Sequence, residues 1–242
     1  MSSFQSAVFA QKAPADPELL IAAASDLSPL QEDLRTAFPA AKLTFSFGAS
    51  GALARQIEQG APFDVFLSAN EAFMLSVVKA GKANKEDILV FATGRLGLWS
   101  KSGAFRSFDD FGKFQKLKIA IANPELAPYG FAARQTLQKF GLWGRHQPDI
   151  VYAENVRQAF QFAETGNVDV AITAWSLVHD KNGVLIPAEG HTPIRQMGAE
   201  LRRSKQRKLG RQFMEFLTSP AGKAILTSHG LFVPNYSPSL KR

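Results

Sequence analysis

The chain has 242 residues, of which 45% are hydrophobic, and this suffices for the core of one large domain or of two smaller ones. It contains no cysteine, which excludes disulfides, thiolate metal ligands and cysteine nucleophiles. The four histidines, at positions 146, 179, 191 and 229, do not have the spacing of metal ligands. The net charge of +7 favours attraction of anions, and charged residues interrupt every apolar stretch before it reaches the length of a membrane span.

Residues 1–18 form a predicted lead-in without strong periodicity. Val8, Phe9 and Ala10 resemble the end of a secretory cleavage site, but the basic start and the long apolar region of a full signal peptide are missing. Both an unstructured lead-in and the remnant of an export signal fit this segment. We favour export.

From Leu19 onward, short apolar runs alternate with amphipathic runs, which predicts strands followed by helices. Leu27, Leu30, Leu34 and Phe38 recur at intervals of three and four residues, as on one face of a helix. The expected strands of this part cover residues 19–24, 42–47 and 64–67.

A second series of the same kind begins near residue 95. Two prolines in the stretch 123–130 exclude ordinary strand pairing and predict a shaped loop before a helix at 131–140. A basic run at 202–208 precedes a terminal helix. The expected strands of this series cover residues 97–100, 117–121, 149–152, 168–172 and 194–201.

The alternation predicts an α/β fold of two lobes, each with a parallel sheet flanked by helices. We expect residues 19–94 and 194–242 to form lobe 1, and residues 95–193 to form lobe 2. The chain would cross between the lobes near residues 90–95 and 187–196, and the two crossings would act as a hinge.

Four predicted strand-to-helix junctions suit the binding of an anion. They contain Ser25, Ser50, the turn around Tyr129, and Val156. A helix N-terminus offers free N–H groups and the positive end of the helix dipole, and a serine adds a hydroxyl donor. Together these junctions would form an anion pocket without a cation. The alternative is that the Ser and Asn residues at the junctions are ordinary helix N-caps.

Several segments resemble the periplasmic molybdate-binding proteins of ABC importers, a family of solute-binding proteins. These segments are residues 21–25, 49–58, 60–69 and 123–130, and the likeness extends from about Leu19 to Pro234. The resemblance implies a two-lobed periplasmic-binding-protein fold with the ligand in the cleft between the lobes. It also implies a periplasmic monomer that binds molybdate or tungstate and delivers it to a membrane permease. Such a protein is not an enzyme and needs no cofactor, nucleic acid or membrane span.

The same resemblance assigns roles to individual residues. It implies that the side chains of Ser25 and Ser50 bind the ligand, together with the backbone N–H groups of Tyr129 and Val156. The metal of this ligand is bound as part of an oxyanion and not as a bare cation. Some members add a Tyr hydroxyl, but the matching position here is Ala174. Members without that tyrosine carry a polar residue directly after the first pocket Ser or Thr.

Asp26 occupies that polar position. We expect it to be an acidic residue in the first turn of a helix that points to solvent, where the helix dipole stabilises it. In the alternative, its carboxylate lies at the pocket. There it would repel a dianion, and it would favour an oxyanion that carries a proton, such as hydrogen phosphate.

Three other functions were weighed. A binding protein for sulfate or phosphate would use the same architecture. A serine hydrolase would use Ser50, because Gly48–Ala52 approximates a nucleophile elbow, together with His229. Ala52 replaces the last glycine of that motif, and this disfavours an enzyme. A DNA-binding regulator would need a helix-turn-helix segment, for which we find no space before Leu19.

Overall fold

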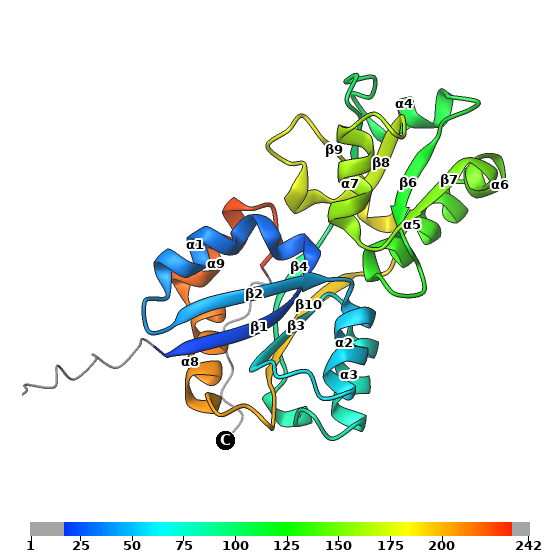
Figure 1. Ribbon diagram of the computed structural model, residues 1–242. Coiled ribbons are helices and arrows are strands. Elements are labelled where there is room, and N and C mark those ends of the chain that lie inside the picture. Colours follow the sequence, from blue (N-terminus) through cyan, green and yellow to red (C-terminus); the bar gives the residue numbers. More distant parts are fainter. Residues whose placement is uncertain (1–16, 234–242) are drawn as a thin grey trace, which may run out of the picture.

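The computed structural model describes residues 17–233, which form two mixed five-stranded sheets in separate halves of the molecule (Figure 1). We call the half that contains the first strand lobe 1 and the other half lobe 2. Most of the predicted lead-in, residues 1–16, lies outside the described residues, as do residues 234–242. Among the described residues, no helix combines the length and the apolarity that crossing a membrane requires.

The sheet of lobe 1 has the strand order β2-β1-β3-β10-β4. β1 runs parallel to both β2 and β3, whereas β10 is antiparallel to β3 and β4. The strands are β1 (Glu18–Ala24), β2 (Lys42–Gly48), β3 (Val65–Ser68), β4 (Leu89–Gly94) and β10 (Ile194–Glu200).

Helices cover both faces of this sheet (Figure 1). Leu19, Ile21 and Ala23 of β1 point to one face and pack in the cluster that contains Phe213, whereas Ala22 points to the other face and packs with Phe66. This alternation is the expected period of a strand between two helical layers. The first layer contains the 3₁₀ helix η1 (Ser25–Leu30), α1 (Gln31–Ala37), α8 (Arg207–Thr218) and α9 (Pro220–Ser228), and the second contains α2 (Ser50–Glu58) and α3 (Glu71–Lys79).

The sheet of lobe 2 has the strand order β7-β6-β8-β5-β9. β6 runs parallel to β7 and β8, and β5 is antiparallel to β8 and β9. The strands are β5 (Leu96–Trp99), β6 (Ile119–Ala122), β7 (Ile150–Ala153), β8 (Val170–Ala174) and β9 (Val184–Leu185).

Two helices pack on opposite faces of the lobe 2 sheet. Ala159 and Ala163 of α7 (Val156–Glu164) lie against Ala120 and Ala171, so small side chains allow a close approach of helix and sheet. On the other face, α5 (Pro128–Lys139) buries Leu137 in the larger cluster of this lobe. Two short helices, α4 (Phe108–Lys113) and α6 (Trp143–His146), and the 3₁₀ turn η4 (Trp175–Leu177) complete lobe 2.

The sheets are mixed, whereas parallel sheets were predicted. The antiparallel pairs involve the strands at which the chain passes between the lobes. In the first passage, β4 ends at Gly94 in one sheet and β5 begins at Leu96 in the other. The return passage enters β10 at Ile194, which pairs with Gly94. The Arg95 guanidinium donates a hydrogen bond to the carbonyl oxygen of Ile186 at 2.8 Å, which ties the first passage to the residue just before the return passage.

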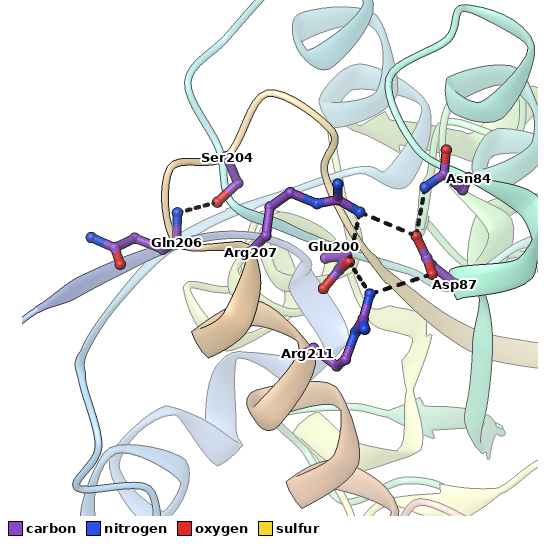
Figure 2. Close-up of polar contacts among 7 residues, drawn as sticks. All are labelled: Asn84, Asp87, Glu200, Ser204, Gln206, Arg207 and Arg211. Atoms are coloured by element: carbon purple, nitrogen blue, oxygen red, sulfur yellow. Dashed lines mark hydrogen bonds and ion pairs between the residues drawn. The ribbon is translucent and has the colours of Figure 1, made fainter.

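The predicted basic run leads into α8, and part of its charge is neutralised (Figure 2). Arg207 and Arg211 each donate to Oε1 of Glu200 at 3.0 Å, and both also lie within 4.0 Å of Asp87. Glu200 is buried at the end of β10, so these ion pairs compensate a charge that would otherwise be costly. The network fixes the start of α8 against the sheet, and it lies within lobe 1.

The packing of α8 generates a stability prediction. Phe213 is fully buried beside Phe38, with ring centroids 5.4 Å apart, so Phe213→Ala leaves a cavity in the core of lobe 1. We expect a loss of about 3–5 kcal/mol in unfolding free energy, measured by urea denaturation. The control is Tyr152→Ala on β7, which is 51% exposed and should cost less than about 1 kcal/mol. Equal losses in the two variants would contradict the assigned core.

Candidate functional site

The N-termini of three helices face the boundary between the lobes. α2 begins at Ser50 just after β2, α5 begins at Pro128 beyond β6, and α7 begins at Val156 beyond β7. Each helix therefore starts at the carboxyl end of a strand, which is where α/β sheets bind ligands. All of these starts are buried at the lobe boundary.

Contacts between the lobes at this boundary are direct. Ala24, Ala49 and Ala69, at the ends of β1, β2 and β3, belong to the same buried cluster as Tyr129 and Val156 of lobe 2. The Gly51 N–H at the start of α2 donates to the carbonyl oxygen of Leu126 at 2.9 Å. Small residues at the strand ends of lobe 1 thus let the helix starts of lobe 2 approach closely.

Ser25 and Ser50 are not helix N-caps, so the capping alternative is wrong for them. The N-cap positions are Ala24 and Ala49, and the two serines are the first residues of η1 and α2. The Ser50 hydroxyl oxygen accepts a hydrogen bond from the Ala69 N–H at 3.1 Å, so its own hydrogen stays free to donate. Within the described chain, no hydrogen bond engages the Ser25 hydroxyl.

Tyr129 and Val156 lie in the first turns of α5 and α7. Pro128 occupies the first position of α5, where a missing N–H costs nothing, and fixes the entry of the chain. Asn155 is a true N-cap of α7, because its side chain accepts from the Gln158 N–H at 3.1 Å. That cap leaves the Val156 N–H unused, and across residues 17–233 neither the Val156 nor the Tyr129 N–H has a protein acceptor.

Two glycines permit the close approach of α5. A side chain at Gly130 would overlap the carbonyl oxygen of Ala122 at the end of β6. A side chain at Gly94 would overlap the hydroxyl of Tyr129. Glycine at these two positions therefore places the start of α5 and the Tyr129 side chain against the passage between the lobes.

Asp26 does not point to solvent, contrary to our expectation. It is 1% exposed, and Oδ2 accepts hydrogen bonds from the Tyr129 hydroxyl at 2.8 Å and from Nε2 of Gln196 at 2.7 Å. The Ser176 hydroxyl donates to the backbone carbonyl oxygen of Asp26 at 2.7 Å. Asp26 and Gln196 belong to lobe 1, the latter on β10, whereas Tyr129 and Ser176 belong to lobe 2. The lobes hide this carboxyl from water between them.

The surroundings of Asp26 shift its titration. Burial raises the pKa of Asp26 from 3.8 to about 6, and the hydrogen bonds from Tyr129 and Gln196 oppose this rise only in part. Burial and the neighbouring carboxyl raise the pKa of Tyr129 well above 10, so the phenol keeps its proton and acts as a donor. The shifts reflect a polar cluster enclosed in an apolar interface.

Sequence reasoning did not anticipate Gln196 and Ser176. Gln196 is fully buried in β10, but the same strand also contains Arg195 and Glu200, so no sequence pattern singles Gln196 out. Ser176 follows Trp175 in a short turn, and no pattern singles it out either. Ala174, which occupies the position of the additional Tyr, is fully buried and brings no side-chain donor.

The arrangement does not favour the hydrolase alternative. His229 contacts Asp33 at 2.7 Å and not Ser50, and no hydrogen bond among the described residues joins Ser50 to a histidine. In the same part of the chain, no group of three or more His, Cys, Asp or Glu residues could hold a metal ion. What the site does present is hydroxyl and N–H donors from both lobes, which can bind an anion without a cation.

Comparison with known proteins agrees with this architecture. The family model of the bacterial extracellular solute-binding proteins matches residues 19–232. The molybdate-binding protein ModA of Rhodobacter capsulatus is 36% identical over 78% of this chain and 76% of its own length. ModA of Azotobacter vinelandii is 31% identical over 88% and 89% of the two chains.

A solved structure shows the same fold. The periplasmic molybdate-binding protein of Azotobacter vinelandii superposes with a TM-score of 0.82 at 28% identity, covering 89% of this chain and 99% of its own. The predicted two-lobed fold, with a sheet flanked by helices in each lobe, is thereby confirmed. Both this structural match and the family model extend over nearly all of the described residues, so the chain belongs to the family of bacterial extracellular solute-binding proteins.

Proposed function

We propose that this protein binds molybdate or tungstate between its two lobes and delivers the oxyanion to an ABC importer. The observation that carries the proposal is the convergence of unused neutral donors from both lobes, on Ser25 and Ser50 and on the first turns of α5 and α7. Relatives at 31–36% identity that are named molybdate-binding proteins support this choice of ligand.

We assign the ligand contacts to two hydroxyl groups and two backbone N–H groups. The hydroxyls of Ser25 and Ser50 would donate from lobe 1, and the N–H groups of Tyr129 and Val156 would donate from lobe 2. The oxyanion would thus be shared between the lobes, with its metal held inside the oxyanion and not as a bare cation. Because ligand contacts from both lobes form only on closure, binding energy would drive the lobes together.

The proposed lobes move as units. Of the described residues, 19–94 with 194–233 would form one body and 95–193 the other, with the hinge at the two chain passages near Arg95. The loaded, closed protein would dock as a monomer in the periplasm on the permease of the importer. No nucleic acid has a part in this cycle, and the family carries solutes without transforming them.

Sulfate and phosphate are the competing ligands. All are tetrahedral oxyanions, so neutral donors alone do not separate them, and the size of the enclosed space must do so. Hydrogen phosphate would find an acceptor for its proton in the carboxylate of Asp26. We favour molybdate and tungstate over both because of the named relatives.

The first prediction concerns ligand selectivity. Molybdate or tungstate at about a hundred times its dissociation constant should raise the unfolding free energy by about 2.7 kcal/mol, because ligand binds only the folded state. Thermal melting with each oxyanion measures this. Sulfate and phosphate should shift the melting temperature weakly or not at all. A larger shift with either of them than with molybdate would contradict the assignment.

The second prediction concerns the two hydroxyl groups. Ser25→Ala and Ser50→Ala should each weaken molybdate binding by about 10- to 150-fold, since each removes a hydrogen bond to a charged group worth roughly 1.5–3 kcal/mol. Calorimetric titration measures the affinities. The matched control is Ser219→Ala, because Ser219 caps α9 by accepting from the Gly222 N–H. This control should lose about 1 kcal/mol of stability and keep its affinity. Unchanged affinity in both site variants would exclude the serines as ligands.

The third prediction tests closure. The added Cβ of Gly51→Ala would lie 2.9 Å from the backbone oxygen of Leu126 in the other lobe and 2.7 Å from the Phe73 ring. We expect molybdate affinity to fall by about 5- to 150-fold, because overpacking at such a contact costs about 1–3 kcal/mol. Gly112→Ala in α4 is the control, since its Cβ would meet no atom within 4 Å. Equal affinities would show that the lobes do not close on this contact.

A further inference from the structure

Closure of the lobes encloses a carboxyl group. The Tyr129 hydroxyl donates a hydrogen bond to the side chain of Asp26 at 2.8 Å. The Ser176 hydroxyl donates one to the backbone oxygen of Asp26 at 2.7 Å, and both donors come from lobe 2. When the lobes separate, these groups leave and water reaches Asp26. With the lobes together, the residue is 1% exposed. Closure therefore moves the carboxyl from water into the interior.

The two oxygens of this carboxyl differ. Oδ2 accepts from Tyr129 and from Gln196, whereas Oδ1 is buried and has no hydrogen-bond partner among residues 17–233. A proton on Oδ1 would leave both bonds to Oδ2 intact, because Oδ2 remains an acceptor. The neutral acid thus keeps both hydrogen bonds to Oδ2, and it removes an uncompensated buried charge.

No charged group compensates Asp26 from the elements packed around it. The titratable group that faces the carboxyl is Tyr129 of α5, and its phenol stays neutral. The other two contacting side chains, Gln196 of β10 and Ser176 of η4, are neutral as well. In the described chain, the charged side chains of β1, β2, α1, α5, α7 and β10 form neither a hydrogen bond nor an ion pair with it. No charged neighbour contributes to its pKa.

We propose that capture of the oxyanion takes up one proton at Oδ1 of Asp26, an inference that rests on the proposed function. The proton comes from solvent and converts the carboxylate into the neutral acid, and no other bond forms or breaks. A dianion enclosed in the same interface, with no cation beside it, makes the charged carboxylate still less favourable. Asp26 is thus the residue that makes binding pH-dependent, and it is the group through which protons and oxyanion are linked.

The sign of the linkage follows from the burial. The pKa of Asp26 is about 6 when the lobes are together, and exposure returns it towards 3.8 when they separate. The loaded state therefore binds more protons than the open state. Affinity for molybdate should rise as pH falls from the pKa of the loaded state towards that of the open state, by up to about tenfold per pH unit.

Calorimetry of molybdate binding at about pH 5, between the two pKa values of Asp26, counts the protons taken up when it is repeated in buffers that differ in ionisation enthalpy. We expect up to roughly one proton for the wild type and about none for Asp26→Asn, whose amide imitates the neutral acid. Asp26→Asn should also bind with an affinity that no longer depends on pH. The matched control is Asp109→Asn, an exposed acid in the first turn of α4, which should behave as the wild type.

The outcomes separate this inference from the proposed function. Molybdate binding by the wild type with no proton uptake and no pH dependence would overturn the inference and leave the function standing. Absence of molybdate binding at every pH would overturn both. If Asp26→Asn fails to fold, Tyr129→Phe serves instead, because it removes a hydrogen bond that stabilises the carboxylate. Its pH profile should move to higher pH, and an unchanged profile would contradict the inference.

Discussion

An anion that is enclosed between two lobes loses its hydration, and hydrogen bonds from the protein must replace what water supplied. The described structure has unused donors for such bonds at helix starts. In α2, α5 and α7 the first-turn groups have no partner within the helix, and the residues around them are small enough for the lobes to touch. The positions of Pro128, Gly130 and Asn155 follow from the same requirement, because they fix the starts of α5 and α7 while leaving the N–H groups of Tyr129 and Val156 unused.

Local sequence patterns predicted the strands and helices that build these starts, since alternation and helical spacing act over a few residues. Strand direction was not predictable in this way, because about a hundred residues or more separate β10 from its neighbours β3 and β4 along the chain. The same limit explains the missed strand β4, which pairs with no strand other than β10 within residues 17–233. α9 was missed although Ser219 and Pro220 are a recognisable helix start.

The candidate site was predicted in part. Ser25, Ser50 and Val156 follow the ends of β1, β2 and β7 within three residues, whereas Tyr129 comes after a loop beyond β6. Their place at the sheet edge could be read from the chain, and the resemblance to a family chose among many such junctions. The burial of Asp26 could not be read locally. Its partners Tyr129 and Gln196 are 103 and 170 residues away in sequence, and only the meeting of the lobes brings them together.

Asp26 also indicates how such a site balances stability against function. A buried carboxyl without a cation is unfavourable for the closed state when it is ionised. The cost falls on closure and not on the folding of either lobe, because the groups that bury Asp26 come from the other lobe. The empty protein would therefore resist closing until a ligand supplies the missing interaction energy, which suits a carrier that must also release its cargo.

The most direct test of the central claim is a crystal structure grown with molybdate, using the anomalous scattering of molybdenum. The account predicts one strong anomalous peak between the lobes, surrounded by oxygens within hydrogen-bond distance of the Ser25 and Ser50 hydroxyls and of the Tyr129 and Val156 N–H groups. A peak elsewhere, such as at the basic residues before α8, would contradict it. Crystals of the closed protein without a peak between the lobes would contradict it equally.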